Sequence, residues 1–199
     1  MKRIVLSITA LLSLVIPSSA KRFAFGVEWG GGSPVVAYHS YSYKLDVGYR
    51  VSDKEWTTPA YPLAYANLKF GYMITPVLET ALTIGYEGVS KVERVIPVTA
   101  RLSVYPAKRE NGGGFMFVGG GVMISENMTS RVTFGGYLGG GYRFRLSSVV
   151  GLELFLRLSI NTRYPDLYDP DTEMKIPSES IYLNRMLQGA VSAGIGISF

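Results

Sequence analysis

The chain has a single histidine, His39, and it lies among hydroxyl side chains and an acid. Ser40 and Ser42 follow it closely, and Asp46 comes further on. A serine becomes a nucleophile when an imidazole within hydrogen-bond reach takes its proton and an acid orients the imidazole. The residue types for acyl transfer are therefore present. The spacing does not itself bring them together, and we expect a surface histidine in a tyrosine-rich loop.

A second candidate for chemistry is an acidic loop near the C-terminus. Asp166, Asp169, Asp171 and Glu173 are interleaved with two prolines. Calcium binds several oxygen ligands, but this spacing is not that of an EF-hand. We expect a solvated acidic loop and no metal site, and no other residues suggest a cofactor.

The most informative charges lie within stretches that alternate with period two. From Leu152 to Ile160, large apolar side chains occupy one face of an extended strand, and Glu153 and Arg157 share the other. In a membrane barrel the apolar face meets lipid and the charges turn inward. We expect a structural network of paired charges inside such a barrel, formed by Glu28, Lys69, Glu79, Glu87, Arg101, Arg143, Glu153 and Arg157.

The elements that would position these charges are strands, because no helical stripe is convincing after Ala20. Gly30 to Gly32 should end the first strand, and Asp53 to Pro62 should form a loop with Trp56. The expected extended segments are 23–29, 39–51, 64–74, 78–86, 94–105, 115–124, 132–144, 152–160 and 188–199.

The first twenty residues have the pattern of an export signal. Met1 to Arg3 is basic, Ile4 to Ile16 is apolar but too short to span a bilayer, and small residues precede Ala20. We expect cleavage after Ala20, which would leave residues 21–199 as one domain. The chain has no cysteine, which excludes disulfides and thiol chemistry, and its net charge of +5 is too small to indicate nucleic-acid binding.

The last stretch, Gln188 to Phe199, places Phe199, Ile197 and Ile195 on one face and small residues on the other. It resembles the C-terminal strand of bacterial outer-membrane β-barrels, which ends in phenylalanine after alternating apolar residues. The resemblance implies that these three residues form the signal that the barrel assembly machinery reads.

Three further runs carry a family resemblance across the middle of the chain. They are RVIPVTARLSVYP at 94–106, GGGFMFVGGGV at 112–122 and FGGYLGGGYRF at 134–144. They resemble the small porin-family or OmpA/OmpX-like outer-membrane β-barrel domains. The resemblance implies a Gram-negative outer-membrane location, short periplasmic turns, long outer loops, and contact with periplasmic chaperones, the lipid bilayer and lipopolysaccharide. It implies no reaction.

Both ends of such a barrel lie in the periplasm, so the number of spanning strands must be even. We therefore predict an all-β, eight-stranded antiparallel transmembrane barrel. In the favoured assignment, 39–51 is an extended flap in the first outer loop. In the alternative, 39–51 is the first spanning strand and 23–29 lies in the lumen.

Eight strands leave an interior that side chains can fill. We therefore expect a membrane-structural or surface-interaction role through the outer loops, without catalysis. A small pore is the main alternative. A lipid-modifying enzyme using His39 and a soluble lipocalin-like barrel with an oily interior are weaker ones.

Overall fold

The computed structural model describes residues 22–45, 48–90, 93–125, 132–169 and 174–199. They form nine β-strands and two single-turn 3₁₀ helices, η2 (Arg109–Asn111) and η3 (Ser178–Ser180). The strands are β1 (Phe23–Lys44), β2 (Arg50–Thr57), β3 (Leu63–Thr75), β4 (Leu78–Gly88), β5 (Arg94–Val104), β6 (Gly113–Ser125), β7 (Thr133–Arg145), β8 (Gly151–Arg163) and β9 (Ile181–Ser198). No helix among the described residues is long and apolar enough to cross a membrane. The predicted export signal, 1–20, lies outside the described residues.

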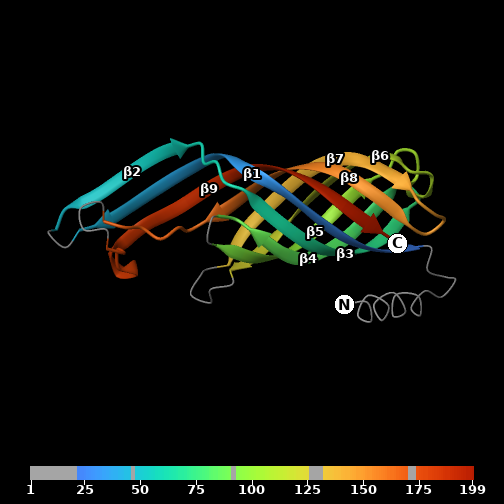
Figure 1. Ribbon diagram of the computed structural model, residues 1–199. Helices are drawn as coiled ribbons and strands as arrows, with labels where there is room; N and C mark the ends of the chain where they lie inside the picture. The colour runs from blue at the N-terminus through green and yellow to red at the C-terminus, as the bar shows by residue number, and fades with distance from the viewer. Residues whose placement is uncertain (1–21, 46–47, 91–92, 126–131, 170–173) are drawn as a thin grey trace, which may run out of the picture.

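Eight of the strands close into an antiparallel barrel (Figure 1). Each strand from β3 to β9 pairs with the next one along the chain, and β1 closes the ring by pairing with both β3 and β9. Beside the last pair, the backbone groups of Phe25 and Phe199 exchange hydrogen bonds of 2.7 and 3.2 Å. The prediction of eight barrel strands is confirmed.

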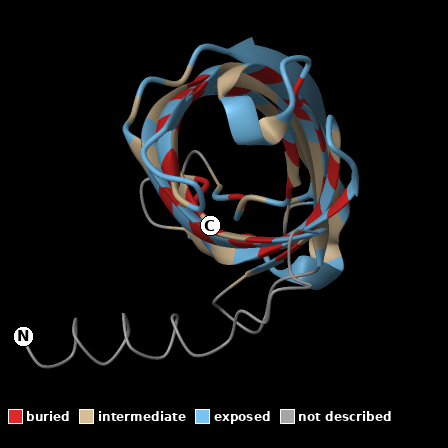
Figure 2. Cartoon of the chain, turned by 90° about the vertical axis from the view of Figure 1, so that its right-hand side faces the viewer, coloured by how far each residue is buried: buried red, intermediate tan, exposed pale blue. Residues whose placement is uncertain are grey.

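Burial alternates along barrel strands such as β3, β4, β5 and β8, and the end-on view in Figure 2 shows buried and exposed residues following one another around the ring. In β8, Leu154, Leu156 and Leu158 are exposed, whereas Glu153, Phe155 and Arg157 are buried. Side chains of a strand point alternately to its two faces, so one set lies inside the ring and the other outside.

The two ends of the barrel differ. The end that holds Phe23 and Phe199, called the terminal end here, has compact connections such as the turn at Pro76, where Thr75 Oγ1 accepts from two backbone N–H groups. The opposite end, called the hairpin end, carries a projecting sheet of three strands (Figure 1). It consists of 36–44 of β1, all of β2, and 181–188 of β9.

Strand β1 is far longer than the sequence indicates. The prediction that Gly30 to Gly32 ends the first strand is wrong, because β1 continues to Lys44 with β9 beside it over most of its length. Glycine is needed here for close approach: a Cβ on Gly32 would lie 2.1 Å from the carbonyl oxygen of Val191. The loop predicted at 53–62 is also wrong in part, because β2 includes Trp56.

The structure decides between the two assignments of 39–51. Phe23 begins a strand of the barrel wall, so the alternative with 23–29 in the lumen is wrong. The described parts of this segment, 39–45 and 48–51, lie toward the tip of the projecting hairpin, consistent with the extended flap. A β-bulge between Pro34 and Val36 separates the wall part of β1 from the projecting part, because Val35 has no partner in β9.

Candidate functional site

The interior of the barrel contains all eight charged residues that the alternation singled out. None of them is more than 6% exposed: Glu28, Lys69, Glu79, Glu87, Arg101, Arg143, Glu153 and Arg157. Isolated charges at such burial would be strongly destabilising, so what matters is how each is paired.

Lys69 is the centre of a charge cluster in the terminal half of the barrel. Its Nζ lies 3.3 Å from a carboxylate oxygen of Glu153, 3.4 Å from Glu79 and 3.8 Å from Glu28. The three acids come from β8, β4 and β1. A single ammonium group on β3 therefore contacts acids of its two neighbouring strands and an acid of β8 across the lumen.

Three arginines complete this cluster. Arg101 Nη1 donates to Glu28 Oε1 at 2.6 Å, and Arg143 Nη1 donates to Glu153 Oε1 at 2.6 Å. The Nε atom of Arg109 lies 3.0 Å from Glu79 Oε2. We call the seven residues the lumen cluster: Glu28, Lys69, Glu79, Arg101, Arg109, Arg143 and Glu153.

Sequence reasoning missed Arg109. It lies in η2, between the predicted extended segments 94–105 and 115–124, and its side chain reaches back to the terminal end of the lumen. Alternation gives no signal for such a residue because it belongs to no strand. Its Nη2 is also 3.4 Å from the backbone oxygen of Phe199.

A second ion pair lies nearer the hairpin end. Arg157 donates to both oxygens of Glu87, at 2.7 and 3.4 Å, in a bidentate arrangement. Its guanidinium also lies over the ring of Tyr65 at 4.0 Å, and its Nε donates to Ser192 Oγ. Four side chains from four strands thus meet across the lumen at this level.

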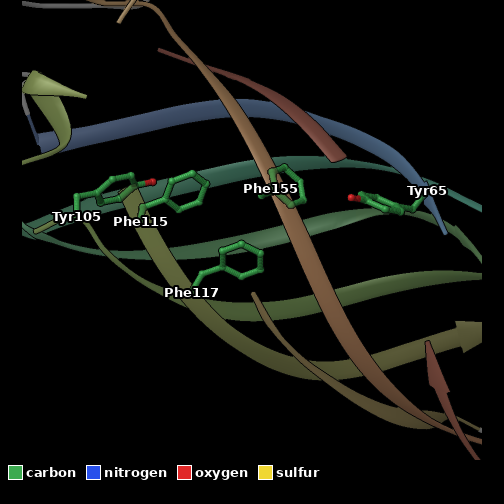
Figure 3. Close-up of a cluster of buried hydrophobic side chains, with 5 residues drawn as sticks. All are labelled: Tyr65, Tyr105, Phe115, Phe117 and Phe155. Carbon is green, nitrogen blue, oxygen red and sulfur yellow. The ribbon is translucent and has the colours of Figure 1, made fainter. Parts of the chain in front are cut away.

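A cluster of aromatic side chains also lies in the interior of the barrel (Figure 3). It consists of Tyr65, Tyr105, Phe115, Phe117 and Phe155, all at most 6% exposed. The guanidinium of Arg101 lies 3.8 Å from the centroid of the Phe117 ring, which links the aromatic cluster to the charges.

Inward-facing glycines make room for these rings. A Cβ on Gly139 would lie 2.5 Å from the Phe117 ring, and one on Gly194 would lie 2.6 Å from the Phe155 ring. The sequence did not reveal this cluster because β6 is apolar on both faces. The one available signal was the pairing of bulky residues in β6 with the glycines of β7.

At the hairpin end, a polar cluster ties two loops to the wall. Arg163 forms an ion pair with Glu93 and donates to Gln188 Oε1 at 2.9 Å. Gln188 Nε2 donates to the backbone oxygen of Val89 at 3.0 Å, and the hydroxyl of Tyr61 donates to Gln188 Oε1 at 3.1 Å. We call these residues the mouth cluster.

The structure separates the groups that could have formed a Ser–His pair. His39 faces the inner side of the projecting sheet, where its Nε2 lies 3.0 Å from Asn184 Oδ1. Ser40 is the next residue of the strand and faces the other side, and Ser42 Oγ accepts from Arg50. The prediction of a surface histidine is wrong, since His39 is only 7% exposed. Asp46 lies outside the described residues.

The acidic loop is only partly described. Asp166 forms an exposed ion pair with Lys175 at 2.9 Å, and the Asp169 N–H donates to the carbonyl oxygen of Met174 at 2.9 Å beside the Tyr168–Lys175 bridge. Asp171 and Glu173 lie outside the described residues. Among the residues that are described, no three potential ligands are grouped as a metal site.

The outer surface of the wall is apolar. Large side chains that are more than 50% exposed occur on six strands of the wall, for example Phe23, Ile74, Leu82, Met116, Phe134 and Leu156. The distribution is the reverse of a water-soluble protein: charges are inside and apolar residues outside.

Solved structures of membrane barrels are similar to this chain at low identity. Neisserial surface protein A (NspA) has 13% identity and a TM-score of 0.46, covering 89% of this chain and 97% of its own. The outer membrane protein OprG from Pseudomonas aeruginosa has 13% identity and a TM-score of 0.46, covering 89% and 95%. The outer membrane protease OmpT from Escherichia coli has 8% identity and a TM-score of 0.42, covering 88% and 96%.

No family model matches the chain, and no curated protein matches it. Because the three TM-scores are below 0.5, no functional argument rests on these similarities. The fold itself, a closed eight-stranded antiparallel barrel, follows from the strand pairing.

Proposed function

We propose that this chain is an integral β-barrel of a bacterial outer membrane, closed inside by its own side chains, with a structural or surface-interaction role. The observation that carries the proposal is the inverted distribution of side chains. Apolar residues cover the outside of a ring whose interior holds paired charges. In water such an exterior would drive aggregation, whereas in lipid it is the stable arrangement.

The dimensions of the strands support this proposal. A transmembrane β-strand needs about 9–11 residues when tilted, and β5 to β8 have 11 to 13 residues each. Closure of the barrel leaves no unpaired wall edge, which a bilayer core would not tolerate. The predicted export signal and the C-terminal strand pattern point to the same location.

The contents of the lumen favour a closed barrel over a pore. The lumen cluster, the Arg157–Glu87 pair and the aromatic cluster all lie within an eight-stranded ring, whose interior is about as wide as its side chains. Ion pairs that connect opposite parts of the wall obstruct the path that an ion would take. We infer that the barrel does not conduct steadily.

The proposal assigns no catalytic role to His39, whose ring contacts Asn184 and Tyr41. Function is then expected at the projecting sheet and the loops of the hairpin end, which extend beyond the apolar wall (Figure 1).

The test is to separate the inner and outer membranes of cells that express the chain and to run the outer-membrane sample with and without boiling. A folded membrane barrel changes its gel mobility on boiling. Release of the protein into the soluble periplasm would overturn the proposal. Planar-bilayer recordings then test closure, since steady single-channel steps would support a pore in its place.

A further inference from the structure

The projecting sheet has two chemically different faces. The register places Ser40 opposite both Lys54 and Arg185, so these side chains lie on one face. Lys44 and Arg50 are paired further along the same face. On the opposite face, Asp53 is paired with Tyr41, and Glu55 with His39. The sheet thus separates positive charges from negative ones.

The positive face, formed by Lys44, Arg50, Lys54 and Arg185, carries no acidic residue among those described. All four side chains are exposed, and none forms an ion pair with a described residue. Arg50 is held in place, because its Nε donates to Ser42 Oγ at 3.0 Å and its guanidinium lies 4.9 Å from the centroid of the Tyr182 ring. Buried arginines of the lumen, in contrast, all have carboxylate partners.

This face continues the apolar outer surface of the wall. Along β9, the outward positions are apolar or glycine from Ile197 to Leu187, and the next one is Arg185. Leu187 pairs with Tyr38, and Tyr38 in turn pairs with Trp56, whose ring centroid is 4.8 Å from that of Tyr38. An apolar band, an aromatic row and then cations follow one another on a single continuous surface.

This order matches the cross-section of a phospholipid or lipopolysaccharide leaflet. Aromatic rings favour the boundary between acyl chains and headgroups, and lysine and arginine extend toward the headgroup level. Guanidinium and ammonium groups form charge-assisted hydrogen bonds with phosphate oxygens.

We propose that the positive face of the projecting sheet binds the phosphate groups of lipid headgroups in the leaflet around the hairpin end. The inference rests on the proposed function, because only insertion of the wall brings headgroups to this level. Each cation near an anionic surface contributes roughly a fivefold gain in affinity. Removal of three cations should therefore weaken binding by about 100-fold, if each contributes independently.

The experiment compares lipid A with dephosphorylated lipid A as ligands for the full mature chain folded in neutral detergent micelles. Native mass spectrometry counts the lipid bound per chain across a titration. The test variant is Lys44→Gln/Lys54→Gln/Arg185→Gln. The matched control, Arg22→Gln/Lys108→Gln/Arg145→Gln, removes the same charge from exposed positions at the terminal end.

We expect the unmodified chain and the control to prefer lipid A over its dephosphorylated form by at least about tenfold, and sodium chloride to reduce this preference. The test variant should lose the preference. Equal binding by the test variant and the control would overturn the inference, as would equal binding of the two ligands by the unmodified chain.

A separate measurement keeps this inference distinct from the proposed function. Every variant is folded into phosphatidylcholine vesicles and tested for the mobility change on boiling. If the unmodified chain does not insert, the proposed function fails. If all variants insert but the lipid A preference does not depend on the positive face, only the further inference fails.

Discussion

The lumen and the projecting sheet share two strands, β1 and β9, yet charged side chains are buried and paired in the lumen and exposed in the projecting sheet. In the wall, the inward-facing Glu28 of β1 is almost fully buried and paired. In the projecting sheet, Lys44 and Arg185 on the same strands are exposed without ion-pair partners among the described residues. Closure of the ring makes the difference, because it removes water from one face of the strands.

The lumen should therefore contribute more to the stability of the barrel than the projecting sheet does. Breaking the lumen cluster leaves charges that cannot be rehydrated, whereas changes in the projecting sheet alter surface chemistry at little cost in stability. The following experiments test this division, beginning with the largest expected effect.

Replacement of Lys69 by methionine should be the most damaging change. It removes the ammonium that lies near Glu28, Glu79 and Glu153, and leaves three buried acids with fewer cations. Loss of one partner of a buried ion pair costs about 3–5 kcal/mol. Urea unfolding from phosphatidylcholine vesicles, followed by tryptophan fluorescence, measures this loss.

The matched control is Lys54→Met on the projecting sheet, which should change the unfolding free energy by less than about 0.5 kcal/mol. Equal effects of the two methionines would contradict the proposed contrast between lumen and projecting sheet.

Alanine at Gly141 should come next. An added Cβ would lie 2.0 Å from the carbonyl oxygen of Leu154 and 2.7 Å from Phe155, in the crowded interior. Overpacking of this kind costs about 1–3 kcal/mol. Gly136→Ala is the control on the same strand, since its Cβ would face outward with its nearest neighbour at 3.5 Å. The same urea titration measures both, and a larger loss for Gly136→Ala would show that the interior of β7 is not the crowded side.

Arg163→Met should have a smaller and more local effect. The mouth cluster loses its ion pair with Glu93 and a hydrogen bond to Gln188. Because the Glu93 side chain is 29% exposed, water compensates in part, and a loss of about 1–2 kcal/mol is expected. Hydrogen exchange should rise first around Val89. Unchanged protection of that segment would show that the mouth cluster does not hold the loop.

Tyr43→Ala should leave the wall almost unaffected. Tyr43 packs with Leu167 and Ile176 in a small apolar cluster beneath the projecting sheet. Its loss should increase hydrogen exchange in β2 and in 38–44 while the urea midpoint of the whole barrel stays nearly constant. A large fall in that midpoint would mean that the projecting sheet and the wall unfold as one unit.

The sequence alone revealed the parts of this molecule that follow strict alternation. The alternation of apolar and polar residues predicted the barrel strands and the inward orientation of Glu153 and Arg157. It did so because successive side chains of a strand point to opposite faces. This reasoning failed for residues outside the strands and for a strand that is apolar on both faces. Arg109 enters the lumen from a turn, and the rings of Phe115 and Phe117 come from a strand that is apolar on both faces.

Glycines make β1 look shorter in the sequence than it is in the structure. A run of three normally ends a strand, but Gly30 and Gly32 fit the close approach of β9 and Tyr65. Only the partner strands on both sides hold this stretch extended, and such long-range pairing leaves no trace in the local sequence. The length of β1, and with it the projecting sheet, therefore could not be inferred.

The bulge at Val35 has a consequence for how the projecting sheet could change by insertion or deletion. One unpaired residue reverses the parity of every later position on β1, so odd-numbered residues face outward at Trp29 but inward at Tyr43. The outward-facing residues of β1 are therefore odd-numbered before Val35 and even-numbered after it. Because Val35 has no partner in β9, its deletion would only remove the bulge and would leave the projecting part of β1 on its present faces. Deletion of one paired residue such as Ala37 would instead move every later residue of β1 to the opposite face.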